Sequence, residues 1–330
     1  ITYIFCPHAS DFFLVLCPQV ILASVTSTES MDGANNSVVS EFVLLGLSAS
    51  WKMKILLFLF FFSFYVGIML GNFFIVFTVI FDSHLHSPMY FLLANLSFID
   101  LGLSSTTVPR MITDIFSEHK VISFPGCMVQ IFFIHVMGGT EMVLLIVMAY
   151  DRYTAISKPL HYLTIMNHKT CICFVVIAWV IGVIHAVSQS VFVVNLPFCG
   201  PNKVDGFYCD ISKVAVLACT DTSWLVYVVT ANSGLISMGT FFLLIISYIF
   251  ILVTVRHHSS AGLSKAFSTL SAHITVVFLF FVPCFFVCVW QVPTLSPAKF
   301  LLILVFLITP LLNPAIYTLR NKDMKHCAKH

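Results

Sequence analysis

The chain carries very little charge for its length. Only 9% of its 330 residues are Asp, Glu, Lys or Arg, whereas hydrophobic residues make up 59%. Soluble domains contain about 25% charged and about 45–50% apolar residues. Because so few charges cannot cover a water-facing surface of this size, we expect the apolar excess to face lipid. The composition therefore excludes an ordinary water-soluble protein.

Motifs that would indicate other classes of protein are also missing. The net charge is only +2 and no basic run occurs, so nothing points to a nucleic-acid partner. The 11 cysteines form no CxxC pair, which removes support for a zinc ribbon or a thioredoxin-like site. No HExxH motif, phosphate-binding loop or Ser/His/Asp set favours a membrane enzyme or a cofactor. The sequence does not divide into two matching halves, so it does not indicate a transporter or a channel.

Long hydrophobic runs are what the sequence has in abundance. A membrane-spanning helix needs about 20 mostly apolar residues, because each residue adds ~1.5 Å. The first such run, from 55 to 81, contains no charged residue at all. We expect an all-α protein, a bundle of seven transmembrane helices. The predicted spans are residues 55–81, 88–108, 127–150, 171–194, 223–255, 266–290 and 299–319.

Several features place the N-terminus outside the cell and the C-terminus in the cytoplasm. Asn35 begins an N-x-Ser sequon, which is useful only on the outer side. The segment between the fourth and fifth spans holds three cysteines, and disulfides persist outside the cytosol. The excess of Lys and Arg on the opposite side is slight. We expect an extracellular segment at 31–54, the transmembrane domain at 55–319 and a cytoplasmic tail at 320–330.

The first thirty residues differ from the rest of the chain. Residues 1–30 precede Met31, and their apolar stretch is interrupted by Pro18. They lack the basic n-region of a signal peptide. We expect residues 1–30 to be a non-native or leader-like extension, with translated upstream sequence favoured over a functional leader.

Several longer strings together indicate a family. Residues 85–101 read LHSPMYFLLANLSFIDL, and residues 148–162 read MAYDRYTAISKPLHY. Residues 265–277 read KAFSTLSAHITVV, and residues 310–325 read PLLNPAIYTLRNKDMK. In this order the strings resemble those of the olfactory receptors, a branch of the rhodopsin-like (class A) G-protein-coupled receptors. The resemblance covers residues 31–325.

The resemblance implies a function. Olfactory receptors bind small, mostly apolar volatile odorants and activate a stimulatory heterotrimeric G protein, which raises cyclic AMP. The resemblance also implies a multi-pass protein of the plasma membrane, embedded in the lipid bilayer and without enzymatic activity. A receptor-like chain that no longer signals is an alternative, although the intact DRY and NPxxY triplets argue against simple loss.

Five residues are candidates for the switch that contacts the G protein. Arg152 lies about 37 Å along the third predicted helix from Cys127, far enough to reach the cytoplasmic boundary. Taken alone, Arg152 is an arginine at a helix end whose side chain extends to the membrane surface. Pro314 taken alone predicts only a kink in its helix. The resemblance implies that Arg152 is held inward until activation. It implies the same switch role for Asp151, Tyr153, Tyr248 and Tyr317.

Four cysteines lie on the expected outer side, namely Cys127, Cys199, Cys209 and Cys219. They can form two disulfides in three ways, and the residues themselves do not choose among them. The resemblance implies the pairs Cys127–Cys209 and Cys199–Cys219.

The ligand site is expected in the outer half of the bundle, about 10–18 Å below Cys127 along the third helix. Two glycines there leave room, although close helix packing is an alternative reading. A histidine beside them either contacts the ligand or makes an interhelix hydrogen bond. The lining is mostly apolar, as in most small-molecule sites. It comprises Ile134, His135, Gly138, Gly139, Phe285 and Cys288, with His185, Gln189, Asn232, Ser233 and Ser237 as further candidates.

Two acids lie near the middle of predicted spans. A charge at the bilayer centre costs about 2.5–3.5 kcal/mol on insertion scales, so Asp100 and Glu141 need an explanation. One explanation is a hydrogen-bonded pair that shares a proton and serves only packing. The other is a sodium site, with Asn72, Ser97 and Asn313 as nearby oxygen donors. The resemblance favours sodium, because rhodopsin-like receptors commonly bind it at the position of Asp100.

Overall fold

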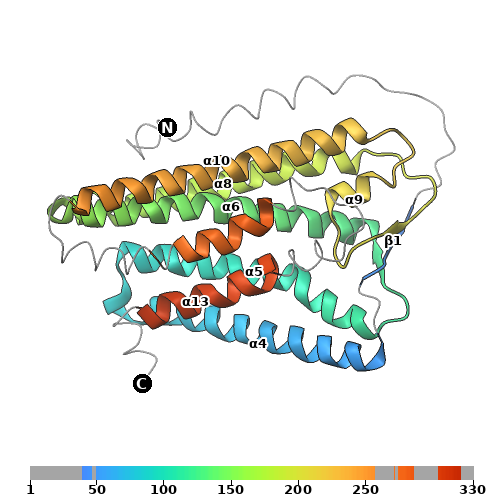
Figure 1. The fold of residues 1–330 in the computed structure, drawn as a ribbon, viewed down its shortest axis with the longest axis horizontal. Helices are drawn as coiled ribbons and strands as arrows, with labels where there is room; N and C mark the ends of the chain where they lie inside the picture. Colours follow the sequence, from blue (N-terminus) through green and yellow to red (C-terminus); the bar gives the residue numbers. More distant parts are fainter. Residues whose placement is uncertain (1–38, 47–49, 257–270, 272–273, 286–303, 321–330) are drawn as a thin grey trace.

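Five long helices dominate the protein. The computed structural model describes residues 39–46, 50–256, 271, 274–285 and 304–320. Among these residues, five helices are long and apolar enough to cross a membrane. They extend along the long axis of the molecule (Figure 1). They are α4 (Trp51–Phe81), α5 (Pro88–Phe116), α6 (Phe124–Ser157), α8 (His168–Val194) and α10 (Ser223–Arg256).

The last two predicted spans are only partly covered by described residues. A helix occupies Ile274–Phe285, inside the predicted span at 266–290. A short π-helical stretch, η3 (Leu304–Ile308), continues into α13 (Thr309–Arg320). The described parts of both segments are therefore helical, and the total of seven crossings stays a prediction.

The long helices extend beyond the predicted spans. α4 begins at Trp51 rather than at 55, and α6 ends at Ser157 rather than at 150. The prediction that α5 ends at 108 is wrong, because the helix continues past Pro109 to Phe116. Hydropathy marks only the lipid-facing part of a helix, and membrane helices tolerate proline where neighbouring groups satisfy the freed carbonyl.

Side-chain caps and a proline fix where three helices begin. At the start of α6, Oγ of Ser123 accepts a 3.2 Å hydrogen bond from the amide of Gly126. At the start of α8, Oδ1 of Asn167 accepts a 3.0 Å hydrogen bond from the amide of Thr170. Ser and Asn are preferred at this position because they satisfy an amide left without a helical partner. Pro88 opens α5, where its missing amide costs nothing.

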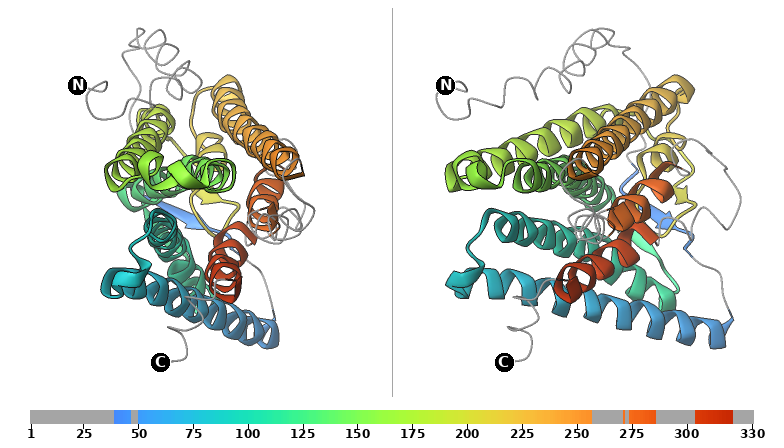
Figure 2. Two further views of the ribbon diagram at one scale, coloured as in Figure 1. Left: turned by 90° about the vertical axis from the view of Figure 1, so that its left-hand side faces the viewer. Right: turned by 60° about the vertical axis from the view of Figure 1, so that its left-hand side comes forward.

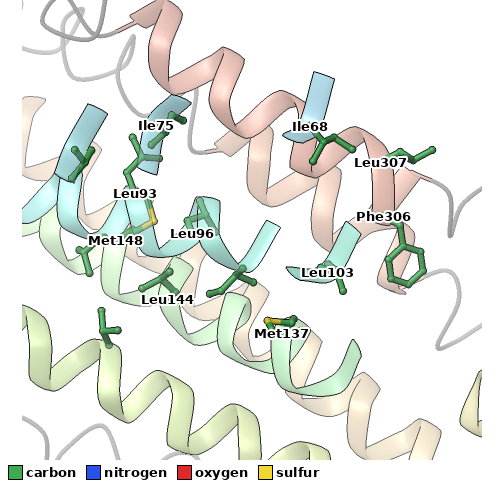
Figure 3. Packing of buried hydrophobic residues seen from close by; sticks show 14 of the residues in the cluster. Ile68, Ile75, Leu93, Leu96, Leu103, Met137, Leu144, Met148, Phe306 and Leu307 are labelled. Carbon is green, nitrogen blue, oxygen red and sulfur yellow. The ribbon is translucent and has the colours of Figure 1, made fainter. Parts of the chain in front are cut away.

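α6 is the central helix of the bundle. It packs against α5, α8 and α10, while α13 packs against α4 and α5 (Figure 2). Leu144 and Met148 of α6 lie near Leu93 and Leu96 of α5, and all four are almost fully buried (Figure 3). This core fixes one face of α6 against α5.

The outside of the bundle is apolar. On α4, Leu70 is 68% exposed and Phe77 is 63% exposed, and on α10 Leu235 is 75% exposed. Soluble proteins rarely expose apolar patches of this extent. Together with the five membrane-length helices, these side chains identify a multi-pass membrane protein.

A small sheet at one end of the bundle was not part of the all-α prediction. β1 (Glu41–Leu44) lies between β2 (Val121–Ser123) and β3 (Lys203–Val204), antiparallel to the first and parallel to the second. Strands of two to four residues, far apart in sequence, leave no periodic pattern to detect. The remaining short elements are η1 (Ser83–Leu85), η2 (Pro159–His161), α7 (Tyr162–Ile165) and α9 (Ile211–Ala215).

Candidate functional site

Two disulfides anchor the loop between α8 and α10, at the same end as the sheet. Cys127 on α6 is joined to Cys209, with Cα atoms 5.5 Å apart. Cys199 is joined to Cys219, with Cα atoms 5.8 Å apart. The amide of Cys209 also donates a 2.9 Å hydrogen bond to Oε1 of Gln130 on α6. These pairings are the ones that the family resemblance implies.

The N-terminal strand β1 and the disulfide-bonded loop together cover one end of the bundle, and we call this covering the cap. The ring centroid of Phe42 lies 6.0 Å from that of Phe124 and 5.5 Å from that of Phe198. Phe42 and Leu44 are both 0% exposed, in one apolar cluster with Cys127. The cap therefore joins the N-terminal segment, the α5–α6 connection and the α8–α10 loop.

The two glycines of the predicted ligand site have different surroundings. A Cβ added at Gly138 would meet no atom within 4 Å. A Cβ added at Gly139 would lie 3.3 Å from Cα of Gly182 and 3.3 Å from Cδ2 of His185, both on α8. Gly138 therefore borders open space. Gly139 contacts α8 closely, as the close-packing reading of the glycines expects.

Three polar side chains, His135, His185 and Gln189, lie on α6 and α8 near these glycines. Nδ1 of His135 is 2.8 Å from the carbonyl oxygen of Ile131. The ring centroids of His135 and His185 are 5.8 Å apart. Nδ1 of His185 and Oε1 of Gln189 are buried without a hydrogen-bond partner. The predicted ligand-binding residues therefore have polar neighbours on the side that faces α8.

The other predicted ligand-binding residues differ in how far they are buried. Ile134 is partly buried and packs against the main core. Phe285 is 37% exposed, and Cys288 lies outside the described residues. The α10 candidates are Ser237, which is buried, and Asn232 and Ser233, which are half-buried.

At the other end of α6, Asp151 has two partners. Nε of Arg152 lies 4.0 Å from Oδ2 of Asp151. The hydroxyl of Tyr162 donates a 2.8 Å hydrogen bond to Oδ1 of the same carboxylate. Burial and the neighbouring Asp151 raise the pKa of Tyr162, so its hydroxyl stays protonated and remains a donor. We did not predict Tyr162 as a site residue, although it ends the string at 148–162.

Two of the three predicted switch tyrosines lie near the end of α6 that is away from the sheet, one on α6 and one on α10. Tyr248 on α10 is 3% exposed and shares a cluster with Leu145 and Ala149 of α6. Tyr153 packs against the same cluster. Tyr317 lies on α13, and its side chain is outside what the structure describes.

The two membrane acids lie in a polar region between α5, α6 and α13. Nδ2 of Asn313 donates a 2.8 Å hydrogen bond to Oδ2 of Asp100. Glu141 on α6 lies close to Asp100, and both acids are almost fully buried. Nδ2 of Asn72 donates to the carbonyl of Pro310 at 2.9 Å. Hydrogen bonds therefore join α13 to α5 at Asp100 and to α4 at Asn72.

Several oxygens of this region lack a hydrogen-bond partner. Buried polar atoms without partners call for an explanation such as a water or an ion. Carboxylate, amide and hydroxyl oxygens are the ligands that hard cations prefer, so the residues fit a sodium ion. The unpartnered atoms are Asn72 Oδ1, Ser97 Oγ, Asp100 Oδ1, both Glu141 carboxylate oxygens, Thr309 Oγ1 and Asn313 Oδ1. Thr309 was not among the predicted donors.

A separate cavity of about 330 Å³ lies at the end of the bundle opposite the cap. It lies between α4, α5 and α8 and is lined by residues such as Ile80, Phe91 and His168. No predicted ligand-binding residue lines it. It therefore lies apart from the predicted ligand-binding residues.

Comparison with known proteins identifies the family. A model of the family described as "Olfactory receptor" matches residues 61–330. Human olfactory receptor 4F15 is 61% identical over 295 residues, which cover 89% of this chain and 95% of that protein. Human olfactory receptor 4F6 is 62% identical over 294 residues, covering 89% and 94% of the two chains. Human olfactory receptor 4K3 is 55% identical over 296 residues, covering 90% and 94%. The predicted resemblance is confirmed, and the chain belongs to the olfactory receptor family, whose members are G-protein-coupled receptors and not enzymes.

Proposed function

We propose that this protein detects small, mostly apolar volatile molecules and activates a stimulatory heterotrimeric G protein, which raises cyclic AMP. The observation that carries this proposal is the family match over residues 61–330. It is supported by an arginine–carboxylate pair at one end of α6 and by open space in the other half of the same helix.

The receptor spans the plasma membrane seven times, with its N-terminus outside. Five membrane-length helices and the helical segments at Ile274–Phe285 and α13 support this topology. The disulfide-bonded cap supports an outer location for that end of the bundle, because disulfides persist outside the cytosol. Asn35, which lies outside the described residues, is glycosylated in this topology.

The odorant binds beside α6, in the half of the bundle nearer the cap. The open space next to Gly138 supports this location. His135, with its neighbours on α8, supplies the few polar atoms of an otherwise apolar lining. An apolar wall with a few polar groups suits a small organic molecule.

The switch lies at the inner end of α6. Asp151 holds Arg152 and accepts the hydroxyl of Tyr162, so that Arg152 is restrained in this conformation. On activation, Arg152 is released toward the G protein. Tyr153, Tyr248 and Tyr317 are its neighbours in this rearrangement.

A sodium ion at Asp100 and Glu141 stabilises the inactive conformation. The unpartnered buried oxygens of α5, α6 and α13 support it. The ion would hold these helices together, and its loss would free α13 to move. A ligand that binds one state more tightly shifts the equilibrium by that difference alone.

The test of the proposed function is a screen of volatile compounds on cells that express the full chain, with cyclic AMP as the readout. We expect at least one compound to give a saturable response that cells without the receptor lack. A receptor that is present at the cell surface but responds to no compound in a broad library would contradict the proposal.

A further inference from the structure

The cavity at the end of the bundle opposite the cap has a polar mouth and an apolar interior. It has a volume of about 330 Å³ and lies between α4, α5 and α8. His86 and His168, both exposed, line it together with the half-buried Asn95. The other described lining residues are apolar, among them Val76 and Phe98. A ligand that fills this cavity must therefore combine polar and apolar parts.

The rise of α5 orders the polar and apolar groups by depth. His86 lies in the turn just before α5, which begins at Pro88. Counted from Pro88, Asn95 lies about 10 Å along the helix axis and Phe98 about 15 Å. The cavity therefore has imidazoles at its mouth, an amide part-way in and an aromatic ring beyond the amide.

The apolar part of the cavity borders the outer surface of the bundle. Ile80 of α4 is 61% exposed and Phe98 of α5 is 54% exposed, and both line the cavity. In a membrane protein such apolar side chains face lipid. A molecule of the bilayer can therefore enter from the side, and an acyl chain that leaves the cavity continues among the other lipids.

The imidazoles at the mouth can donate hydrogen bonds to an anion. Nε2 of His86 lies 3.4 Å from the carbonyl oxygen of Ile80, which can only accept, so this nitrogen carries a proton. In the imidazolium form Nδ1 donates as well, so His86 can bind the carbonyl and an anionic oxygen together. His168 is the first residue of α8, and its ring centroid lies 5.7 Å from that of Phe91. Both rings border one small cavity, so they can share one phosphate.

Asn95 suits the part of a phospholipid that follows the phosphate. Its Nδ2 donates a 2.8 Å hydrogen bond to the carbonyl of Phe91. An amide nitrogen carries two hydrogens, so the second can be donated to an ester carbonyl. The ester groups of a phospholipid lie between its phosphate and its acyl chains, as Asn95 lies between His86 and Phe98. A sterol has only one hydroxyl and would leave one of these two polar levels without a partner.

The surface around the mouth carries positive charge. Lys169 directly follows His168, Lys158 lies in the connection between α6 and α8, and both lysines are exposed. Asp82, the acid of the α4–α5 turn, accepts a 2.9 Å hydrogen bond from the amide of His84. Basic groups at a membrane surface attract anionic lipids. The charge therefore favours an anionic headgroup over a zwitterionic one.

We propose that this cavity binds one anionic phospholipid of the surrounding bilayer. The phosphate contacts His86 and His168, an ester carbonyl accepts a hydrogen bond from Asn95, and one acyl chain lies against Phe98. The bound lipid bridges α4, α5 and α8. In the proposed topology this end of the bundle lies in the cytoplasmic leaflet, which is rich in anionic lipids, and only this assignment to a leaflet rests on the proposed function.

The test uses the purified full chain in a mild detergent, with phosphatidylserine, phosphatidylcholine or cholesterol added in increasing amounts. Native mass spectrometry counts the lipids that each chain retains. We expect one phosphatidylserine per chain at concentrations at which phosphatidylcholine is not retained. Phosphatidylserine should also raise the thermal unfolding midpoint with a saturable dependence, because binding to the folded state stabilises it.

Variants locate the lipid. A double variant with His86→Gln and His168→Gln should retain phosphatidylserine about 10-fold more weakly, because a hydrogen bond to a charged group contributes roughly that factor. Both imidazoles are exposed, so the fold should be kept. Ala94→Phe narrows the apolar part of the cavity and should also weaken retention. The matched control combines His84→Gln and His161→Gln, two exposed histidines that are not among the described lining residues, and it should bind as the unmutated chain does.

Two results would overturn the site: equal retention of phosphatidylserine and phosphatidylcholine by the unmutated chain, or equal retention of phosphatidylserine by the double variant and its control. Displacement of phosphatidylserine by an equal concentration of cholesterol would overturn the class of lipid. A receptor that responds to an odorant but retains no phosphatidylserine overturns the site alone. A chain that retains this lipid but answers no odorant overturns only the proposed function.

Discussion

Nδ2 of Asn313 donates a 2.8 Å hydrogen bond to Oδ2 of Asp100 and so joins α13 to α5 across 213 residues of sequence. Glu141 of α6 lies close to the same acid, and neither of its carboxylate oxygens has a hydrogen-bond partner. Because three helices meet at this point, anything that binds there acts on their relative positions.

Sodium should therefore lower basal or odorant-driven activity. The measurement is the cyclic AMP response in buffers in which a large organic cation replaces sodium at constant ionic strength. Asp100→Asn and Glu141→Gln should each remove the sodium sensitivity, because each removes a charged oxygen ligand of the ion. Equal responses of the unmutated receptor in both buffers would leave the acids only a packing role, with a shared proton.

Replacing Arg152 should abolish signalling without removing the protein from the membrane. Arg152→Ala removes the guanidinium group that pairs with Asp151. It leaves the buried apolar side chains of α6 unchanged. We expect no odorant-driven cyclic AMP and nearly normal surface expression, measured by antibody labelling of intact cells. A variant that signals at the unmutated level would refute the assigned role.

Breaking the cap disulfide should prevent delivery to the cell surface. Loss of a native disulfide costs about 2–5 kcal/mol in small secreted domains. Cys127→Ser and Cys209→Ser should therefore be retained inside the cell. The matched control is Cys171→Ser, because Cys171 is buried but forms no disulfide. Peptide mapping without reduction checks the pairing, and a Cys127–Cys199 or Cys127–Cys219 peptide would contradict it.

The neighbouring glycines should respond differently to the same substitution. Gly138→Leu fills open space, so we expect a shifted or lost odorant response with normal surface expression. Gly139→Leu forces bulk against Gly182 and His185, where overpacking costs about 1–3 kcal/mol. It should lower surface expression as well. An unchanged dose–response curve for Gly138→Leu would place the odorant elsewhere.

Removing one aromatic ring from the N-terminal strand should loosen the cap. Phe42 is 0% exposed, and Phe→Ala substitutions in cores cost about 3–5 kcal/mol. We expect Phe42→Ala to reduce the thermal stability of the purified receptor. The control is Glu41→Ala, since Glu41 lies next to it on the strand with an exposed side chain. Equal stability of both variants would show that the strand contributes little.

The sequence predicted the helices well because each contains a long, mostly apolar run. The first five predicted spans each lie within one of the five long helices, which extend further at one or both ends. Hydropathy reports contact with lipid, whereas a helix ends where its hydrogen bonds and caps end. The strand at Glu41–Leu44 could not be predicted, because its partners are short and lie in loops far along the chain.

The sequence predicted only those features of the candidate site that follow from the spacing of residues along one helix. Spacing along one helix placed Gly138 and Gly139 at the same depth but did not separate the open side of α6 from the side that contacts α8. Contacts between elements, such as Tyr162 with Asp151, depend on how a loop folds back. No periodic pattern within a single sequence encodes such a contact.

The position of β1 at the centre of the sheet sets an order of events during synthesis. Its partner strands are made much later, and the Asn202 side chain that binds the carbonyl of Glu41 is 161 residues away. Only β2 can pair with the N-terminal segment before α6 and α8 are made, so the sheet is completed after α4, α5, α6 and α8 have been synthesised. Pairings this distant are slow to form. Closure of the cap is thus a late step of biogenesis, and a quality-control system that senses the unpaired strand would monitor the assembly of more than half of the receptor.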